Sequence, residues 1–440
     1  MWLIYNILFA LGFTAMLPWF LVRMLRRGGY RAGFMQRLGC YDAALRQRLA
    51  ARERVWVHAV SVGEVFVALR LMAELRALRP ELAFVLTTTT STGHRMADAR
   101  LAPTDVLLYF PVDFPGVVRR VLRTLQPRAL LLTEGEIWPN LIRLAKASAI
   151  PVLLINGRMS AASFRGYQRM RLFSRPILRS LDALLVQGET DRERLVQLGV
   201  VPERVVVTGT AKYDMAASGD TAGAARAWLD ALGIPRNALI VLGGSTWPGE
   251  EAALLRAFSA IRREVPDVTL VLVPRHAERG AEVSHAIQQS GLSLARRSDA
   301  VSGSRADLPP AVVLVDSTGE LLDFYACATV VFVGKSLLHH GGQNFIEPAL
   351  LGKAVITGPH LENFPDVAAD FQAAQAFIQV KDEAALETVL LDLLQHPDRR
   401  EALGQRGQAL VRSRQGVVRK TAEAVVRVLE DSDFHRRSQR

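Results

Sequence analysis

The chain has 440 residues, a length that is too great for one compact core and suits two domains. Half of its residues are hydrophobic and 22% are charged, which excludes a disordered or low-complexity protein. The formal net charge of +11 lies at the two ends, because residues 1–54 hold nine arginines against two acids and residues 436–440 hold three arginines. The nearly neutral body between them is not typical of a nucleic-acid-binding domain. The two cysteines, Cys40 and Cys327, are too few for a disulfide framework and favour a reducing compartment.

The segment 1–22 contains no charged residue and is rich in large apolar side chains. As a helix it would rise about 33 Å, close to the roughly 30 Å thickness of the hydrocarbon core of a bilayer. The segment 23–50 is basic and juxtamembrane, and by the positive-inside rule it keeps the rest of the chain in the cytoplasm. Its first arginines are Arg23, Arg26, Arg27, Arg31 and Arg37. We therefore predict a membrane anchor at 1–22, which either spans the bilayer or, because Asn6 and Pro18 interrupt it, lies in one leaflet. A cleaved signal peptide would need basic residues before the apolar stretch and a small-residue cleavage site after it, and the sequence has neither feature.

Beyond residue 50, short apolar runs alternate with amphipathic stretches, a pattern that predicts βαβ units around buried parallel sheets. The pattern restarts near residue 237, so we expect two doubly wound, Rossmann-like α/β domains at 51–212 and 237–411, a linker at 213–236, and a terminal helix with a basic tail at 412–440. The expected strands are 55–60, 84–87, 129–133, 152–156, 183–187, 205–209, 238–243, 269–273, 312–315, 330–333 and 354–357. The expected helices are 64–78, 117–125, 222–232 and 412–430.

Ligands of such folds bind at the carboxyl ends of the strands, and with two domains the expected site is the cleft between them. No G-x-G-x-x-G fingerprint opens a helix, and Gly334-Lys335-Ser336 lacks the earlier glycine of a Walker A loop because Thr329 stands there. These absences argue against an NTPase. Adjacent His339 and His340 would point in different directions along an extended chain, so the sequence predicts no metal site there.

Three polar residues at expected strand ends of the first domain are candidates for chemistry. Glu64 follows Gly63 at the start of a helix, where it could act as a general base or could only complement the helix dipole. Glu134 follows the 129–133 run beside Glu136, in a turn that could equally be a surface loop. Lys212 could offset negative charge that develops during a reaction, or could be an ordinary solvated lysine.

The second domain carries several turns that suit phosphate or ribose. A helix start follows Gly243-Gly244-Ser245-Thr246 and offers free N–H groups to an anion, although an ordinary capped turn would look the same. Arg275, after Pro274, could pair with a phosphate. Thr318-Gly319-Glu320 repeats the strand, glycine and helix-start pattern, and Glu347 could accept both hydroxyls of a ribose. Several such turns in one domain indicate nucleotide binding.

These motifs together resemble the 3-deoxy-D-manno-octulosonic acid (Kdo) transferases, membrane-associated glycosyltransferases of the GT-B fold. The resemblance covers almost the whole chain, in order. The matching segments are S-V-G-E (61–64), T-x-T-x-T-G (88–93), Y-F-P-V-D (109–113), E-G-E-I-W-P-N (134–140), N-G-R-M-S (156–160), T-G-T-A-K (208–212), G-G-S-T-W-P-G-E-E (243–251), P-R-H (274–276), T-G-E-L (318–321) and G-G-Q-N-F-I-E-P (341–348).

The resemblance implies two Rossmann-like domains that face a central cleft and an N-terminal membrane-anchor helix. It implies transfer of Kdo from CMP-Kdo to the lipid A precursor, lipid IVA, on the cytoplasmic face of the inner membrane, with inversion and with no metal, cofactor or nucleic acid. Glu64 matches the general base, and Glu134 and Lys212 match positions that stabilise the transition state. The positions that match CMP-contacting segments are Pro274, Arg275, Thr318, Gly319, Glu320, Asn344, Phe345, Ile346 and Glu347.

Two departures from the family pattern, and two other functions, remain open at this stage. The family often reads G-G-H-N-P-L-E-P, so Gln343, Phe345 and Ile346 put the contacts of those side chains in doubt, and Gly135 stands where threonine is common. One alternative function is a membrane-associated GT-B enzyme that uses a UDP-sugar. The other is a non-catalytic, lipid-binding protein with a GT-B-like body, against which the intact Glu64, Glu134, Lys212 and Glu347 argue.

Overall fold

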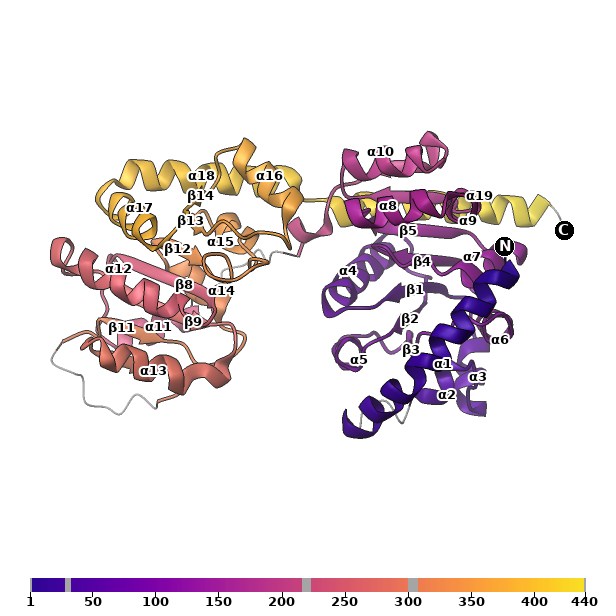
Figure 1. Cartoon of the computed structure of the whole chain (residues 1–440), viewed down its shortest axis with the longest axis horizontal. Coiled ribbons are helices and arrows are strands. Elements are labelled where there is room, and N and C mark those ends of the chain that lie inside the picture. Colours follow the sequence, from indigo (N-terminus) through magenta and orange to yellow (C-terminus); the bar gives the residue numbers. More distant parts are fainter. Residues whose placement is uncertain (1, 28–32, 216–222, 300–307, 439–440) are drawn as a thin grey trace. The chain divides into compact units, whose positions relative to one another are not determined.

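The computed structural model describes residues 2–27, 33–215, 223–299 and 308–438, and it divides into two compact units (Figure 1). The first unit comprises Met1–Met215 together with Gly416–Arg440, and the second comprises Ala216–Gln415. Residues 216–222 of the predicted linker lie outside the described residues. Each unit is a parallel sheet covered by helices on both faces, so the predicted doubly wound α/β architecture is confirmed.

The first unit contains a seven-stranded parallel sheet in the order β3-β2-β1-β4-β5-β6-β7. Its strands are β1 (Val55–Ala59), β2 (Phe84–Thr88), β3 (Val106–Tyr109), β4 (Ala129–Thr133), β5 (Val152–Gly157), β6 (Ala183–Val186) and β7 (Val205–Val207). Its helices are α1 (Trp2–Arg27), α2 (Phe34–Arg37), α3 (Ala43–Ala50), α4 (Val62–Leu78), α5 (Ser91–Asp98), α6 (Pro115–Leu125), α7 (Pro139–Ala147), α8 (Ala161–Arg169), α9 (Arg171–Arg179), α10 (Glu189–Gln197) and α19 (Val417–Ser438), with 3-10 turns η1 (Pro202–Arg204) and η2 (Ala211–Tyr213).

Alternate residues of each strand feed two separate cores. Val55 and Val57 of β1 pack on one face with α4 and α19, whereas Trp56 packs on the other face with α6 and α7. Successive side chains of a strand point to opposite faces, so a strand buried on both faces is apolar throughout. That is why the central strands read as continuous apolar runs in the sequence.

The second unit contains another seven-stranded parallel sheet, in the order β10-β11-β9-β8-β12-β13-β14. Its strands are β8 (Ile240–Thr246), β9 (Thr269–Pro274), β10 (Leu294–Arg296), β11 (Val312–Leu314), β12 (Val330–Val333), β13 (Ala354–Thr357) and β14 (Ile378–Gln379). Its helices are α11 (Gly223–Ala231), α12 (Glu250–Glu264), α13 (Gly280–Gln289), α14 (Leu321–Cys327), α15 (Ile346–Leu350), α16 (Pro365–Ala373), α17 (Glu383–Gln395) and α18 (Pro397–Arg414), with a 3-10 turn η3 (Ala277–Arg279).

Every strand that the sequence predicts is present, but three further strands form that it does not predict. These are β3, β10 and β14, and each lies at an edge of its sheet. An edge strand pairs on one side only and is covered less completely, as the half-buried residues of β10 show. β10 therefore carries a weaker apolar run than a central strand, whereas β3 is apolar and mostly buried and was nevertheless not predicted.

The predicted continuous helix at 412–430 is wrong, because the chain breaks between α18 and α19. Gly416 has a φ of +89°, a conformation that suits glycine. The carboxylate of Asp214 then accepts hydrogen bonds from the backbone N–H groups of Gly416 (2.7 Å) and Val418 (2.6 Å), which caps the new helix. The chain thus returns to the first unit, where α19 packs on α4.

The predicted anchor forms helix α1, but within the described residues no helix has an apolar stretch long enough to cross a membrane. One face of α1 is instead committed to the first unit. The Tyr5 hydroxyl donates to the Asp113 carboxylate (2.8 Å), and the Asn140 amide donates to Asn6 Oδ1 (2.7 Å). The ring of Phe9 packs edge-on against Phe114. The prediction of a spanning anchor is therefore not supported. The physical reason is that polar and aromatic side chains on one face of α1 dock on the first unit.

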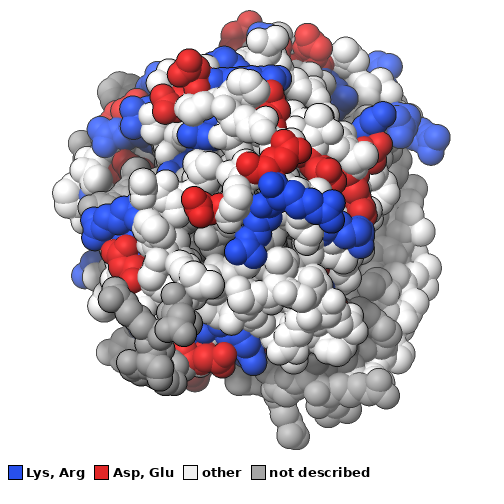
Figure 2. Space-filling model, turned by 90° about the vertical axis from the view of Figure 1, so that its left-hand side faces the viewer, with Lys and Arg blue, Asp and Glu red and all other residues white. Residues whose placement is uncertain are grey.

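One arginine of the predicted basic segment does not contribute to a basic surface. Arg37 is only 8% exposed, donates to the Thr89 carbonyl (2.8 Å) and stacks on the Tyr109 ring. Elsewhere, charges are mostly mixed in sign: Figure 2 shows basic and acidic side chains interspersed over one face of the molecule. In the second unit, Arg256 pairs with Glu383 (2.7 Å). Such pairing agrees with the nearly neutral body that the sequence predicts.

Candidate active site

Glu64 lies at the carboxyl end of β1, in the first turn of α4, where it is 8% exposed. Ser61 caps the helix, and its hydroxyl accepts from the Glu64 N–H (3.3 Å). The Glu64 carboxylate in turn accepts from the N–H groups of Val60 (3.0 Å) and Ser61 (3.2 Å), which completes a capping box. The Thr133 hydroxyl, at the end of β4, donates a short 2.6 Å bond to the same carboxylate. Three donors therefore hold Glu64 in one orientation and leave part of its acceptor capacity unused.

Glu134 lies close enough to both Glu64 and Lys212 to interact electrostatically with each of them. Burial raises the pKa of Glu134, and the negative charge of Glu64 raises it further, while the cations Lys212 and Arg158 oppose both effects. Glu136 adds a smaller increase to the same pKa. The structure thus brings together the three residues that the sequence proposed for catalysis. Neighbouring carboxylates in different environments are typical of acid and base pairs in enzymes.

The loop of Lys212 is tied to the sheet by Asn156. The Asn156 side-chain oxygen accepts from the Ala211 N–H (3.1 Å), and the Thr210 hydroxyl accepts from the Lys212 N–H (3.4 Å). The Glu134 carbonyl accepts from the Arg158 N–H (3.4 Å). The ends of β4, β5 and β7 are therefore linked through short polar contacts beside Glu64.

His58, near the end of β1, is fully buried below the strand-end residues and contacts Glu136. Its Nδ1 lies 3.1 Å from the Thr87 hydroxyl, its ring stacks on Phe110 with centroids 3.6 Å apart, and its Nε2 lies 3.6 Å from a Glu136 oxygen. The same Glu136 oxygen accepts from the Trp138 indole (2.9 Å). Glu136 is thus occupied by structural contacts, whereas Glu134 is the acid that faces Glu64.

In both sheets, non-glycine residues at the strand ends, where ligands are expected to bind, adopt left-handed backbone conformations. Glu134 (φ +52°) follows β4, and Asn156 (φ +48°) lies near the end of β5. In the second unit, Ser245 (φ +53°) lies in β8, and Lys335 (φ +56°) follows β12. Such conformations cost roughly 1–3 kcal/mol each and cluster at functional sites. The four positions therefore support the strand ends as the functional edge of each sheet.

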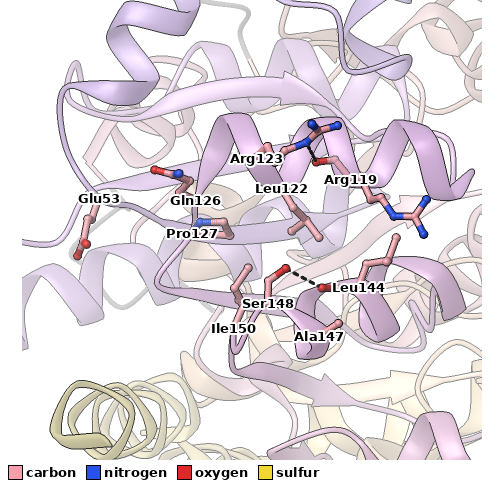
Figure 3. A pocket seen from close by; sticks show the side chains of 10 residues that line it. All are labelled: Glu53, Arg119, Leu122, Arg123, Gln126, Pro127, Leu144, Ala147, Ser148 and Ile150. Atoms are coloured by element: carbon pink, nitrogen blue, oxygen red, sulfur yellow. Dashed lines mark hydrogen bonds between the residues drawn. The ribbon is translucent and has the colours of Figure 1, made fainter. Parts of the chain in front are cut away.

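Two of the cavities in the first unit lie at opposite ends of the strands. A small one of about 40 Å³ is lined by Glu134, Arg158 and Tyr167, among others, and adjoins the catalytic candidates. A larger open cavity of about 710 Å³ lies before β1, β4 and β5, at the amino ends of the strands (Figure 3). Its wall includes Arg119 and Arg123 of α6 around the apolar Leu122 and Leu144. Because ligands of these folds bind at the carboxyl ends, the larger cavity is not the candidate active site.

In the second unit, the ends of β8 and β12 approach so closely that only glycine fits. A Cβ on Gly334 would lie 2.4 Å from the Ser245 carbonyl oxygen, and one on Gly244 would lie 2.5 Å from the Tyr325 hydroxyl. Glu250, at the start of α12, is fully buried and accepts from the N–H groups of Lys335, Ser336 and Leu337 at 2.7–3.0 Å. One carboxylate therefore holds the loop that follows β12 against the first turn of α12.

The predicted nucleotide-binding residues surround this edge but differ in how accessible they are. Arg275 follows Pro274 at the end of β9 and is exposed, and no residue in the described part of the chain accepts a hydrogen bond from its guanidinium. Thr318 and Gly319 are exposed in the turn before α14. The Glu320 carboxylate is held by Arg297 (2.7 Å), which lowers the pKa of Glu320.

The Q-N-F-I-E segment (343–347) offers fewer side chains to a ligand than the sequence suggests. Phe345 and Ile346 are fully buried, and the Phe345 ring packs against Phe371 in the core, so only their backbone could reach a ligand. Asn344 accepts from the Ile346 N–H (3.1 Å) and donates to Glu347. Burial raises the pKa of Glu347 despite that hydrogen bond. Asn344 and Glu347 are therefore the side chains of this segment that remain available.

Several residues of these sites were not among the predicted ones. Thr133 and Arg158 adjoin the carboxylates of the first unit, and Glu250 organises the second. Lys335 places its Nζ 4.4 Å from the centre of the Trp247 ring. Arg158 and Glu250 lie inside quoted family motifs, Lys335 lies in the Gly334-Lys335-Ser336 segment, and Thr133 ends the predicted strand 129–133. Residue type alone singled out none of them.

Comparisons with known proteins match this chain to one family. The family model described as "3-Deoxy-D-manno-octulosonic-acid transferase (kdotransferase)" matches residues 32–215. A 3-deoxy-D-manno-octulosonic acid transferase of Bordetella pertussis is 37% identical, over 92% of this chain and 94% of its own. One from Haemophilus influenzae is 30% identical, over 91% of this chain and 92% of its own.

Solved structures share the fold at low sequence identity. A glycosyltransferase of Rickettsia africae superposes with a TM-score of 0.59 at 10% identity, over 86% of this chain and 99% of its own. An Anabaena protein crystallised with UDP superposes with a TM-score of 0.57 at 13% identity, over 86% of this chain and all of its own. With the catalytic candidates grouped at one strand edge and relatives matched over nine-tenths of the sequence, the chain belongs to the 3-deoxy-D-manno-octulosonic acid transferase family.

Proposed function

We propose that this protein transfers Kdo from CMP-Kdo to the lipid A precursor, lipid IVA, with inversion at the anomeric carbon and with no metal in the reaction. The observation that carries the proposal is the grouping of Glu64, Glu134 and Lys212 at the carboxyl ends of β1, β4 and β7. Kdo transfer needs a base for the acceptor hydroxyl and positive charge near the reacting centre. This group of residues contains both.

In the proposed reaction, Glu64 takes the proton of the acceptor hydroxyl. The oxygen then attacks the anomeric carbon of Kdo while the bond to the CMP phosphate breaks and CMP leaves with the electron pair. A single displacement of this kind inverts the anomeric centre. The three donors on Glu64 orient its carboxylate, which general-base catalysis requires. Lys212 and Glu134 would stabilise the charge that develops in the transition state.

The second unit would hold the donor. The exposed guanidinium of Arg275 suits the CMP phosphate, and the turn at Thr318 and Gly319 leaves backbone N–H groups accessible. Glu347 suits the ribose hydroxyls, and Asn344 orients it. Lys335 adds a cation beside the point where the glycine-containing ends of β8 and β12 approach each other. Contacts of Phe345 and Ile346 would be made through backbone atoms alone.

We further propose that the first unit touches the inner membrane through α1, on the cytoplasmic face. The side of α1 opposite its docking face exposes an apolar stripe, with Leu3 71% and Leu11 64% exposed. The first turn of α9 exposes Leu172, and Phe173 beside it packs on Trp2 of α1. A helix with one apolar face outward suits an interfacial position, close to a membrane-embedded acceptor.

The test is incubation of the purified protein with CMP-Kdo and lipid IVA, followed by mass spectrometry of the lipid. We expect the lipid to gain the mass of one or more Kdo residues, with the anomeric configuration inverted. Thermal protection by CMP, but not by UDP, would identify the donor nucleotide independently of the acceptor. Protection by UDP alone would favour a UDP-sugar enzyme, and absence of both donor hydrolysis and transfer would contradict an enzymatic function.

A further inference from the structure

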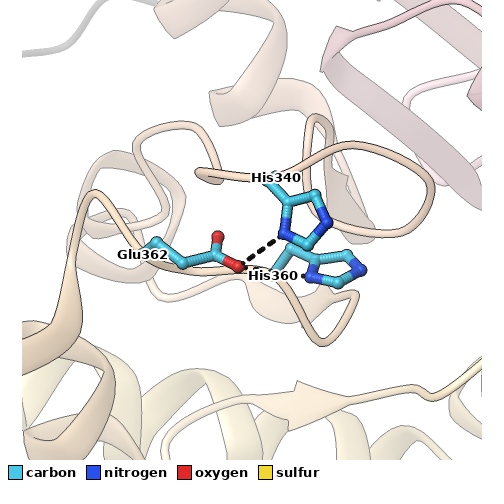
Figure 4. Close-up of side chains that lie close together, drawn as sticks. All are labelled: His340, His360 and Glu362. Atoms are coloured by element: carbon cyan, nitrogen blue, oxygen red, sulfur yellow. Dashed lines mark hydrogen bonds and ion pairs between the residues drawn. The ribbon is translucent and has the colours of Figure 1, made fainter.

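Two loops of the second unit bring His340, His360 and Glu362 together, as Figure 4 shows. His340 belongs to the loop between β12 and α15, and His360 and Glu362 belong to the loop between β13 and α16. Nδ1 of His340 lies 2.8 Å from Glu362 Oε1, and Nδ1 of His360 lies 3.3 Å from the same oxygen. The two imidazole centroids are 3.9 Å apart. The sequence paired His340 with its neighbour His339, but the partners of His340 are twenty residues further along the chain.

The backbone of the two loops holds this cluster in place. The Asn363 N–H donates to the Gly341 carbonyl (2.9 Å), and the His360 N–H donates to the Ser336 carbonyl (3.0 Å). The second carboxylate oxygen of Glu362 accepts from the Gly341 N–H (2.6 Å). A Cβ on Gly341 would lie 2.7 Å from the Asn363 side-chain amide, and the φ of +120° at Gly341 is a conformation that favours glycine. The three side chains are therefore positioned by main-chain contacts as well as by the hydrogen bonds that join both imidazoles to Glu362.

The donor atoms are those of a site for a divalent transition metal. Imidazole nitrogen and carboxylate oxygen bind Zn²⁺ at roughly 2.0–2.2 Å, and tetrahedral geometry then separates neighbouring ligand atoms by about 3.3 Å. The observed separation of 3.3 Å matches that value, and the separation of 2.8 Å is about half an ångström shorter. All three ligand atoms lie within 4.8 Å of one another. The exposed side of His340 leaves room for a water molecule as a fourth ligand.

We propose that His340, His360 and Glu362 bind one divalent transition-metal ion, for which Zn²⁺ is the best match. Two imidazoles favour Zn²⁺ and its neighbours in the first transition row over Mg²⁺, which prefers oxygen ligands alone. The bound ion would cross-link the loop after β12 to the loop after β13. The first of these loops leads directly into Asn344 and Glu347, so the ion would stiffen the predicted donor-binding segment without entering the reaction proposed above.

The experiment is a titration of the metal-stripped full-length protein with Zn²⁺, followed by calorimetry and by competition with a chromophoric chelator. We expect one site per chain in the wild type. His340→Ala and His360→Ala should each weaken binding at least about tenfold, because each removes one of three ligands. Glu362→Gln is a third variant, which removes the carboxylate ligand and leaves both imidazole rings in place. Mg²⁺ should not compete.

The matched control is His339→Ala, since His339 lies in the same loop and contacts the Pro248 carbonyl instead (2.8 Å). This variant should bind Zn²⁺ as the wild type does. Co²⁺ should give the visible absorption of a site with mixed nitrogen and oxygen ligands, and it should lose that absorption in Glu362→Gln. Circular dichroism of every variant without metal checks that the fold is intact.

Three outcomes would overturn the proposal: no saturable binding by the wild type, equal affinity in all variants, or loss of binding in His339→Ala alone. Because the titration contains neither donor nor acceptor, its result is independent of the proposed transfer reaction. A protein that binds Zn²⁺ as described but does not use CMP-Kdo would keep the metal site and lose only the proposed function.

Discussion

Glu64, at the end of β1, makes a structural capping contact and is also the residue proposed as the general base. Its carboxylate completes a capping box with Ser61 and also faces Glu134. A glutamate that only caps a helix and a glutamate that acts as a base have the same local sequence. The proximity of Glu134 and Lys212 is what favours the catalytic interpretation.

We predict that Glu64→Gln lowers the turnover number by at least about 100-fold, because a general base contributes roughly 10²–10⁴ in rate. Binding of CMP, measured by calorimetry, should be unchanged. The matched control is Ser61→Ala, which removes the cap at a cost of about 1 kcal/mol but keeps the carboxylate. Comparable activity losses in the two variants would mean that Glu64 acts only through the helix.

Asp113 provides a prediction about pH. Burial raises the pKa of Asp113 from 3.8 to about 6, in spite of hydrogen bonds from Asn140, Tyr5 and Leu141. Between these values the folded protein keeps a proton that the unfolded chain has lost. The contribution to stability is therefore fully present below about pH 4 and is lost as the pH rises through about 6. The shift corresponds to about 3 kcal/mol.

The measurement is the free energy of unfolding of the first unit at pH 4 and at pH 7, for the wild type and for Asp113→Asn. Other carboxyl groups titrate in both proteins, so the difference between the two isolates Asp113. We expect the wild type to lose about 3 kcal/mol more than the variant over this interval. Parallel pH profiles would show that Asp113 is not the responsible group.

At the scale of elements, helix α1 shows that length and apolar character do not decide how a segment is used. Its inner face carries Tyr5, Asn6 and Phe9, which contact Asp113, Asn140 and Phe114. Its outer face carries leucine and isoleucine side chains exposed to solvent. The sequence of a spanning helix and that of a docked interfacial helix can look alike, because both are long and rich in apolar residues.

We predict that Ile4→Gln and Leu8→Gln, on the outer face of α1, weaken binding to anionic lipid vesicles. Both side chains are at least 60% exposed, and inserting each into lipid is worth roughly 1.5–3 kcal/mol. Each substitution should therefore lower the vesicle partition coefficient about tenfold in a sedimentation assay, with little change in melting temperature. Leu308→Gln, at an exposed leucine of the second unit, should leave binding unchanged. Equal effects at all three positions would contradict a role for α1.

At the scale of the whole molecule, the chain crosses from the first unit to the second and then returns. The return is made by α19, which buries Val418, Ala422, Val425 and Leu429 in the core that α4 also lines. These positions follow the helical period, so one stripe of α19 completes one face of the first sheet. The N-terminal half of the sequence is therefore not a complete domain by itself.

We predict that a chain ending at Gln415 loses much of the stability of its first unit. Removing four buried apolar side chains costs several kcal/mol, which should lower the corresponding calorimetric transition by about 10 °C or more. The transition of the second unit should stay in place. A chain ending at Asp431 keeps all four side chains and serves as the control. An unchanged first transition in the shorter chain would show that α19 is dispensable.

How much of the fold the sequence predicts depends on how each strand is buried. Central strands such as β1 and β4 are buried on both faces and were predicted from their apolar runs. Among the edge strands, β10 is only half-buried and was not predicted, whereas β7 was predicted from its valine run. The same holds for the site. Glu64, Glu134 and Lys212 follow strong strands and were proposed from the sequence, whereas the contacts of Thr133, Arg158 and Glu250 come from segments that no local pattern shows.

By itself, the sequence determined two doubly wound units, the strand ends that carry charged residues, and the family motifs. These follow from periodicity and residue type within a few positions of the chain. Only the tertiary structure decided that Arg37 is buried, that Phe345 packs into the core, and that His340 meets His360 and Glu362. Each of these outcomes depends on which distant segment packs against the residue, and local sequence carries no record of that partner.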